Sequence, residues 1–226
     1  MKQGHLHPST QILRELIKIF RELDFEVYEG PEVDDEWHNF DALNLPEDHP
    51  ARDEQDTFYL KNRRVLRTHT SNCQIRAAKD LKVPIRVVIP GKCYRNEATD
   101  DSHETTFYQL EGLYIDKKVT VAHLFSTVEQ VLKKVYKGEI EYRVRPHHYP
   151  FVEPGYDFDV NTKRGWLEVL GSGMVHPKVL RNMGLDPEKY SGFAFGMGPD
   201  RMMLRKHGIL DIRNLWQSDL RFLRQF

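Results

Sequence analysis

Apolar side chains recur at helical spacing in two segments of the chain. The first begins after His7-Pro8, and its apolar face consists of Ile12, Leu13, Leu16, Phe20 and Leu23. The second runs from Val121 to Tyr136, with an apolar face of Leu124, Phe125, Val128, Val131, Leu132 and Val135. Residues three and four apart share one side of a helix, so both segments are predicted to be amphipathic helices. Pro199 is predicted to open a final helix that ends near Lys206.

Shorter apolar or alternating segments predict strands. They are Phe25 to Val33 (interrupted by Gly30-Pro31), Ile85 to Ile89, Lys92 to Glu97, Thr106 to Ile115, Glu141 to Arg145 and Gly165 to Leu170. The polar residues 98–105 would join two of these strands into a hairpin with a long tip. Residues 39–56 contain two prolines and little periodicity, which predicts a long ordered loop.

Helices and strands are mixed but do not alternate regularly. This order disfavours a doubly wound parallel sheet and predicts an α+β fold with a mainly antiparallel sheet. The chain has no internal repeat, low-complexity segment or convincing linker, so residues 1–226 are expected to form a single domain.

Composition narrows the class of protein. Of 226 residues, 39% are hydrophobic and 11% aromatic, which excludes a disordered chain. The longest stretch free of charged residues runs only from Gln3 to Leu13, so neither a membrane span nor a signal peptide is expected. Cys73 and Cys93 form no Cys-x-x-Cys pair. A soluble protein of a reducing compartment, most simply the cytoplasm, is therefore expected.

The net charge of -1 conceals an asymmetry along the chain. Residues 29–56 are strongly acidic, with a single basic residue, Arg52, whereas residues 201–226 carry an excess of basic side chains. Two solvated faces would explain this pattern. A basic end that faces an anionic partner, with an acidic stretch against a protein surface, would explain it too.

A polar face is predicted on the hairpin. Arg95 and Glu97 lie near the end of its first strand, and Gln109 and Glu111 project from one face of its second strand. Charged side chains are poor core material without partners, so this face suits a ligand with an anionic group and an amine. A solvated outer face with cross-strand ion pairs explains the same spacing.

The segment 192–201 holds three glycines, which allow close approach of the backbone. Pro199 suits the first position of a helix, which places Arg201 in the first turn, where amides and a guanidinium could meet phosphate. The segment is neither a Walker A loop nor a dinucleotide fingerprint. A tight strand-to-helix connection is the alternative, and Gly171-Ser172-Gly173 is interpreted as a turn.

Two other chemistries are disfavoured. The eleven histidines lack the spacing of a zinc site. Neither Cys73 nor any serine lies in a recognisable nucleophile elbow.

Several short motifs follow one another along the chain. They are Glu29-Gly30-Pro31-Glu32-Val33, Asn39-Phe40-Asp41-Ala42-Leu43-Asn44, His49-Pro50-Ala51-Arg52-Asp53, Arg67-Thr68-His69-Thr70-Ser71, the stretch from Arg95-Asn96-Glu97 to Glu111, Tyr149-Pro150-Phe151-Val152-Glu153-Pro154, Gly173-Met174-Val175-His176-Pro177, and Gly196 to Arg201. With these motifs the chain resembles the catalytic module of class II aminoacyl-tRNA synthetases, in particular the family of bacterial-type phenylalanyl-tRNA synthetase alpha subunits. The resemblance covers nearly the whole chain.

The resemblance implies roles for individual residues. Arg95 would contact the α-phosphate of ATP, and Arg201 would cover the adenine and reach the γ-phosphate, which makes these two the catalytic residues. The remaining ATP-binding residues would be Glu97, His103, Phe107 and Gly198. The amino-acid site would consist of His69, Ser71, Gln109 and Glu111 for the ammonium and carboxylate, Tyr149 and Phe151 for the ring, Ala194 as the floor, and Gly196. Glu153 would ligate a magnesium ion shared with a partner subunit, and Glu168 the magnesium ion bound to ATP.

The same resemblance implies a reaction and an assembly. The family activates L-phenylalanine with ATP and Mg²⁺ to phenylalanyl-adenylate and transfers it to tRNA(Phe). Its alpha chains assemble with beta chains, as an α2β2 heterotetramer, and do not act at a membrane. The helix that carries Ile12, Leu16 and Phe20, and the acidic segment after Gly30, are accordingly expected partly at a subunit interface.

The sequence departs from the family pattern in three respects. Family members usually begin with a long coiled-coil arm that binds tRNA, whereas this sequence starts just before His7-Pro8. Position 149 is Tyr149 where phenylalanine is usual, and position 55 is Gln55 where some relatives carry tryptophan.

Two other functions stay open from the sequence. One is a synthetase paralogue that uses a different acceptor or another aromatic amino acid. The other is a non-catalytic module with a regulatory or assembly role, against which the presence of both Arg95 and Arg201 argues.

Overall fold

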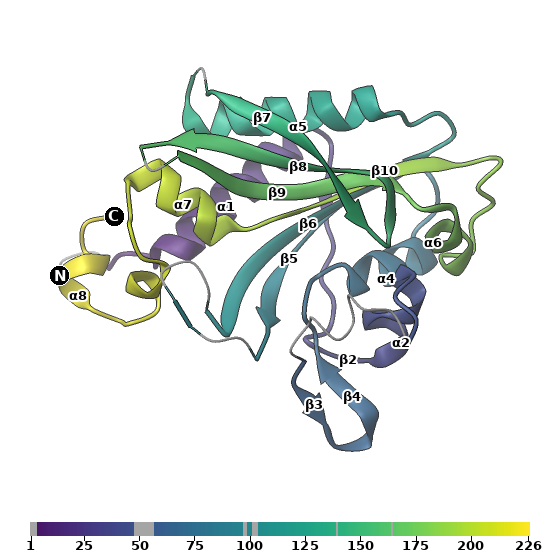
Figure 1. Ribbon diagram of the computed structural model, residues 1–226, viewed down its shortest axis with the longest axis horizontal. Coiled ribbons are helices and arrows are strands. Elements are labelled where there is room, and N and C mark those ends of the chain that lie inside the picture. The colour runs from purple at the N-terminus through teal and green to yellow at the C-terminus, as the bar shows by residue number, and fades with distance from the viewer. Residues whose placement is uncertain (1–3, 48–56, 97–98, 101–103, 139, 164) are drawn as a thin grey trace.

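The computed structural model describes residues 4–47, 57–96, 99–100, 104–138, 140–163 and 165–226, and it is built around a seven-stranded sheet (Figure 1). In spatial order the strands are β1 (Glu26–Val27), β5 (Ile85–Tyr94), β6 (Thr106–Asp116), β10 (Ser191–Met197), β9 (Gly165–Val175), β8 (Val152–Thr162) and β7 (Tyr142–Tyr149). Only the β1–β5 pair is parallel, and the other pairs are antiparallel. The predicted α+β fold with a mainly antiparallel sheet is confirmed.

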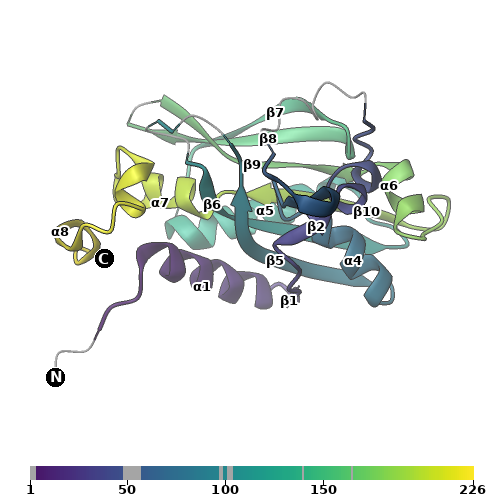
Figure 2. The ribbon, with the colours of Figure 1, turned by 90° about the horizontal axis from the view of Figure 1, so that it is seen from below.

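One face of this sheet packs against the two predicted amphipathic helices, α1 (Pro8–Arg21) and α5 (Val121–Tyr136) (Figure 2). The ring of Phe20 stacks on that of Phe195 at 5.2 Å. Because Gly112 on the neighbouring strand has no side chain, the ring of Phe195 can lie directly over it. Apolar strand residues that alternate toward these helices form the larger of two hydrophobic clusters.

The apolar face of α1 is not available to a partner chain. Ile12, Leu16 and Phe20 are between 0% and 1% exposed, because they pack inside this chain. These three side chains are therefore not exposed to a partner, while the expectation that the helix and the acidic segment after Gly30 lie partly at a subunit interface stays a prediction.

The other face of the sheet is covered at one end by three short elements. They are η1 (Asp41–Leu43), α4 (Asn72–Asp80) and α6 (Pro177–Asn182), which Figure 1 shows at the end of the sheet opposite α7 (Pro199–His207), η3 (Ile212–Leu215) and α8 (Leu220–Leu223). Ile75, Leu180 and Leu113 of β6 belong to the hydrophobic cluster on this face. Further along the same face of β6 the side chains are polar, beginning with Glu111 and Gln109. This change from apolar to polar defines where the functional site lies.

A small antiparallel sheet projects from the body of the molecule (Figure 1). Its strands, in spatial order, are β2 (Val33–Asp35), β4 (Arg64–Leu66) and β3 (Tyr59–Leu60). The helices α2 (Glu36–Asn39) and η2 (Lys61–Arg63) belong to the same part of the chain.

Several predicted boundaries are wrong. The segment 25–33 forms no single strand: it contributes β1 to the large sheet and ends at β2 of the small one. The predicted strands 85–89 and 92–97 are one strand, β5, which continues through Pro90. Proline is tolerated because β1 pairs only with Val87 and Val88, so no neighbouring ladder on that side loses a bond at Pro90.

Other elements were not predicted. The helix α2 ends at residue 39, and η1 lies within the predicted loop 39–56, of which residues 48–56 lie outside the described residues. The pattern also missed α4, α6, β8 and β10. β8 contains Pro154, Gly155 and two aspartates, a composition typical of turns. Asp157 and Asp159 are nevertheless buried, because arginines of β7 pair with them.

Among the described residues, none of the helices has the length and apolar character needed to cross a membrane.

Candidate active site

A cavity of about 440 Å³ lies over the partly uncovered face of the large sheet. Strands β6, β9 and β10 supply its floor, and its walls come from residues 69–74, residues 147–152 and the start of α7. The predicted site residues that line it are His69, Ser71, Arg95, Phe107, Gln109, Glu111, Tyr149, Phe151, Glu168, Ala194, Gly196, Gly198 and Arg201. Segments far apart in the sequence thus meet in one hollow.

Among the predicted residues that the structure describes, Glu153 is not part of this lining. Glu97 and His103 lie outside the described residues. Glu153, at the start of β8, is 75% exposed, and its carboxylate lies 3.5 Å from Nε2 of His176 rather than in the cavity. Glu153 and Glu168 therefore belong to different places on the protein.

Glu111 is a buried carboxylate at the floor of the cavity. It accepts hydrogen bonds from Oγ of Ser71 at 2.8 Å, from Nε2 of Gln109 at 2.7 Å and from Nε2 of Gln74. Burial raises the pKa of Glu111 to about 7, although the hydrogen bonds from Ser71 and Gln74 oppose the rise. All three donors that the described residues provide are neutral. A cationic group of a ligand would therefore stabilise the ionised carboxylate.

Gly196 leaves space for the carboxylate of Glu111 because it has no side chain. A Cβ atom on Gly196 would lie 2.8 Å from both Oε1 of Glu111 and Nε2 of Gln109. Any side chain at position 196 would displace the network on the adjacent strand.

His69 is buried beside the cavity and is neutral at pH 7. Burial, together with the positive charge of Arg95, lowers its pKa to about 3. Neither ring nitrogen has a hydrogen-bond partner among the described residues. Buried polar atoms without partners are rare in folded proteins, so His69 is available to a polar ligand group.

Arg95 and Phe107 contact each other near the loop end of the β5–β6 hairpin. Nε of Arg95 donates a hydrogen bond to the carbonyl oxygen of Thr68 at 3.0 Å. Its guanidinium carbon lies 4.9 Å from the ring centre of Phe107, which is the geometry of a cation–π contact. The hairpin register brings them together, because Phe107 on β6 pairs with Cys93 near the end of β5.

A second arginine enters from the first turn of α7. Gly198 precedes this helix and Pro199 is its first residue, as the sequence predicts. Nη1 of Arg201 lies 3.6 Å from Oε1 of Glu168 on β9. Asp200, which is 2% exposed, fastens the same turn to β6 by accepting a hydrogen bond from the backbone N–H of Tyr108 at 3.2 Å.

Aromatic rings form one wall of the cavity. The rings of Tyr149 and Phe151 stack at 5.5 Å with an interplanar angle of 25°. The hydroxyl of Tyr149 donates a hydrogen bond to Asp157 at 2.7 Å. Ala194, which is 5% exposed, lies on β10 across the same face. The cavity thus has an aromatic wall in addition to the carboxylate of Glu111.

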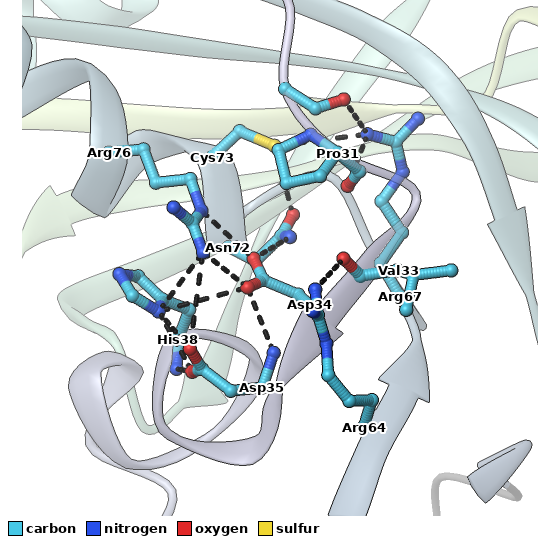
Figure 3. Close-up of polar contacts among 11 residues, drawn as sticks. Pro31, Val33, Asp34, Asp35, His38, Arg64, Arg67, Asn72, Cys73 and Arg76 are labelled. Carbon is cyan, nitrogen blue, oxygen red and sulfur yellow. Dashed lines mark hydrogen bonds and ion pairs between the residues drawn. The ribbon is translucent and has the colours of Figure 1, made fainter. Parts of the chain in front are cut away.

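The strand β2 and the helix α4 are joined by a polar cluster behind the cavity (Figure 3). The buried carboxylate of Asp34 accepts hydrogen bonds from Asn72 at 2.7 Å and from Arg76. Arg67 donates to the carbonyl oxygens of Pro31 at 3.2 Å and Lys92 at 2.7 Å. These contacts hold the segment that carries His69 and Ser71 against the end of β5.

The same cluster contains the one grouping of possible metal ligands among the described residues, Asp34, Asp35 and His38. Arg76 already neutralises Asp34, and His38 is hydrogen-bonded to Asp35 at 2.8 Å. These carboxylates already have partners within the chain. The cluster therefore joins β2 to α4 and is not a second carboxylate site for the metal ion that accompanies ATP.

Sequence reasoning missed three residues that shape the cavity. Gln74 lies one helical turn after Ser71, a spacing that could have indicated it. Asp200 is adjacent to Arg201, and Asp157 gave no signal because its segment resembled a turn. Gly171-Ser172-Gly173 is not a turn: these residues lie within β9, and Gly171 and Ser172 line the cavity.

The fold and this site define the catalytic core of a class II aminoacyl-tRNA synthetase. The family model described as "tRNA synthetases class II core domain (F)" matches residues 1–226, so the chain belongs to this family.

The curated relatives narrow the class further. The phenylalanine–tRNA ligase alpha subunit of Clostridium kluyveri is 49% identical over 99% of this chain and 69% of its own length. The alpha subunit of the same name from Proteus mirabilis is 48% identical over 100% of this chain and 69% of its own length. That from Leptospira biflexa is 48% identical over 100% of this chain and 70% of its own.

Among solved structures, the pyrrolysyl-tRNA synthetase from Desulfitobacterium hafniense superposes with a TM-score of 0.74. The likeness covers 93% of this chain and 74% of that one at 18% identity. At this identity it shows a shared fold.

Proposed function

We propose that this chain is the catalytic alpha subunit of a phenylalanine–tRNA ligase, which activates L-phenylalanine with ATP and transfers it to tRNA(Phe). The relatives that carry this name support the reaction. The observation that carries the proposal is the juxtaposition of Glu111 with the aromatic wall in one cavity. A free amino acid has a cationic end and, in phenylalanine, an aromatic end, and the cavity offers a counterpart to each.

The polar end of the cavity suits the ammonium and carboxylate of the amino acid. Glu111 would bind the ammonium group of the substrate. Gln109 and Ser71, which donate hydrogen bonds to Glu111, would keep the carboxylate of Glu111 oriented. His69, with two unpartnered ring nitrogens, would meet a polar atom of the substrate. These contacts bring the substrate carboxylate toward Arg95.

The apolar end suits the phenyl ring. Tyr149 and Phe151 would contact it through edge-to-face or offset stacking, and Ala194 would close the floor of the pocket. Gly196 would leave room for the backbone of the amino acid between the two ends.

ATP would lie beside the amino acid over the hairpin. Its adenine would stack on Phe107, with Glu97 and His103 as further predicted contacts, and Gly198 and Arg201 would cover it from α7. The carboxylate oxygen of phenylalanine then attacks the α-phosphate, the bond from that phosphorus to the bridging oxygen breaks, and pyrophosphate leaves. Arg95 stabilises the negative charge that builds on the α-phosphate oxygens, so no protein nucleophile is needed.

A magnesium ion would fit beside Glu168 in the proposed ATP site. Glu168 lines the cavity, lies against Arg201 and is 42% exposed, and one carboxylate plus phosphate oxygens is a usual Mg²⁺ environment. When bound there, Mg²⁺ neutralises charge on the phosphates. Glu153 is exposed and lies beside His176, so a metal ion at that position would need further ligands from a partner subunit.

We further propose that residues 1–226 act as a single catalytic domain together with a beta subunit, in an α2β2 assembly, in the cytoplasm where tRNA is charged. The alpha-subunit names of the relatives support a beta partner.

The deciding experiment is pyrophosphate exchange with the chain and its beta subunit, across all twenty amino acids. Exchange that depends on phenylalanine is expected. Exchange stimulated best by another amino acid, or by none, would contradict the proposal and favour the paralogue or the non-catalytic module.

A further inference from the structure

Asp157 lies on β8 directly behind the aromatic wall. Its side chain is 2% exposed and does not line the cavity. Oδ1 of Asp157 accepts the hydrogen bond that the hydroxyl of Tyr149 donates, at 2.7 Å. Asp157 can therefore influence a ligand in the cavity only through neighbours that line it, and the two that contact it are Tyr149 and His147.

The ring of Tyr149 fits a narrow slot in the sheet. A Cβ atom on Gly171 would lie 2.5 Å from its hydroxyl oxygen, so glycine is required on β9 at this point. The ring of His147 lies 4.4 Å away and that of Phe151 lies 5.5 Å away. Packing confines the plane of the ring, and the hydrogen bond to Asp157 fixes its tip.

Asp157 is itself held independently of Tyr149. Its Oδ2 lies 3.3 Å from Nη2 of Arg145 and 3.2 Å from Nδ1 of His147, both on the neighbouring strand β7. The dependence is thus one-sided: Asp157 retains partners without the tyrosine, whereas the half-buried hydroxyl of Tyr149 depends on Asp157. A buried hydroxyl left without a partner is costly, so the ring would move to recover one.

We propose that Asp157 is a positioning residue for amino-acid specificity, because its hydrogen bond to Tyr149 holds the ring that walls the side-chain pocket. This assignment rests on the proposed function. It also implies that the hydrogen of the Tyr149 hydroxyl is committed to Asp157 and is not offered to a substrate hydroxyl. Tyrosine at position 149 therefore acts as a tethered phenyl ring.

The test compares kcat/KM in pyrophosphate exchange for phenylalanine and para-chlorophenylalanine, using the chain assembled with its beta subunit. Asp157→Ala should raise the ratio of para-chlorophenylalanine to phenylalanine by about five-fold or more, a fraction of what a methylene-sized change in an apolar pocket produces. The KM for phenylalanine should rise while kcat changes little, because ring contacts stabilise ground and transition states alike. Asp157→Asn, which keeps an oxygen acceptor, should stay within about three-fold of the parent.

Asp159 supplies a matched control. It is also 2% exposed, lies two positions along β8, and pairs with Arg143 at 2.8 Å and Arg145 at 2.6 Å. Its hydrogen bonds go to Arg143 and Arg145, and neither residue belongs to the aromatic wall. Asp159→Asn should lower the free energy of unfolding but leave the substrate ratio unchanged.

A double-mutant cycle separates positioning from general damage. If Asp157 acts through Tyr149, Asp157→Ala should change the ratio in the parent but not in a Tyr149→Phe background. If Asp157→Ala does not fold, Tyr149→Phe alone carries the test, since Arg145 and His147 still satisfy Asp157. It should shift the ratio in the same direction.

Three results would overturn the assignment: an unchanged ratio in Asp157→Ala, an unchanged ratio in Tyr149→Phe, or an equal effect of Asp157→Ala in both backgrounds. Each presupposes a parent enzyme whose exchange depends on phenylalanine. A parent without that dependence would refute the proposed function itself, and the two failures are therefore distinguishable.

Discussion

The buried carboxylate of Asp200 accepts a hydrogen bond from the hydroxyl of Ser9 at 2.8 Å, although 191 positions separate the two residues. Ser9 lies in the first turn of α1 and Asp200 in the first turn of α7. The bond therefore ties the start of the chain to the helix that presents Arg201. Burial raises the pKa of Asp200, and the two hydrogen bonds that it accepts oppose that rise.

Ser9→Ala should lower the free energy of unfolding by about 1–3 kcal/mol, because it leaves a buried carboxylate oxygen without its partner. Urea unfolding measures this. Thr127→Ala, which removes an exposed hydroxyl from α5, should change stability by no more than about 0.5 kcal/mol. Equal effects of the two variants would show that the Ser9–Asp200 bond contributes nothing.

Arg95→Ala should reduce phenylalanyl-adenylate formation by about 100-fold or more, as expected when one preorganised donor to the transition state is lost. Arg95→Lys should recover only part of the activity, because lysine lacks the planar fork and stacks poorly on Phe107. Single-turnover adenylate formation is the measurement. Arg221→Ala, at a side chain that is 92% exposed, is the control and should retain full activity. Activity of Arg95→Ala within a few-fold of the parent would remove this hairpin from the ATP site.

Glu111 should make phenylalanine binding depend on pH. Burial raises its pKa from 4.5 to about 7, so below pH 7 the ligand ammonium must first displace a proton. The Kd for phenylalanine should therefore fall as pH rises from 6 to 8 and level off above about 7. Isothermal titration calorimetry at several pH values measures it, and Glu111→Gln should bind more weakly, without this dependence. A Gln variant with the parental pH profile would assign the titration to another group.

The same shift has the opposite consequence for folding. Because the folded state holds the proton of Glu111 more tightly than the unfolded state, its contribution to stability is present below pH 4.5. That contribution is lost as pH rises through about 7. Relative to the parent, Glu111→Gln should accordingly gain stability above pH 7, measured by urea unfolding at pH 6 and pH 8.

Ala194→Gly should widen the apolar end of the pocket by one methyl group. Activation of para-chlorophenylalanine should rise by about ten-fold or more relative to phenylalanine, since a methylene-sized change is worth roughly 1–3 kcal/mol of discrimination. Tyrosine should still be rejected, though less strongly, because an apolar pocket only weakly excludes an added hydroxyl. Steady-state kcat/KM for the three amino acids is the readout. Unchanged ratios would mean that the ring does not reach Ala194.

Phe20→Ala should lower the free energy of unfolding of the chain alone by about 3–5 kcal/mol, because its ring is fully buried against Phe195. Arg21→Ala, on the exposed side of α1, should have an effect below about 0.5 kcal/mol. If Phe20→Ala lowered the free energy of unfolding of the isolated chain only slightly, this face of α1 would again be a candidate for the subunit interface.

Much of the architecture could be predicted because it depends on local patterns. The face of Leu124 and Val128 specifies a helix through its 3.6-residue period, and α5 has the predicted bounds. Pro199 similarly marked the start of α7. Strand β8 could not be predicted this way, because its aspartates are acceptable inside a sheet only when Arg143 and Arg145 of β7 lie beside them.

The sequence by itself predicted the chemistry-bearing residues: two arginines, a hairpin face with Gln109 and Glu111, and a glycine-rich segment before Arg201, most of which the structure shows to be strand β10. Those assignments depend on motifs whose residues lie within a few positions of one another. Only the tertiary structure decided what each side chain contacts. Glu111 acquires its raised pKa from burial, and the hydroxyl of Tyr149 donates its hydrogen bond to Asp157, because the strands pair in one register. Burial and partnership are properties of the packed sheet, and no local pattern along the chain encodes them.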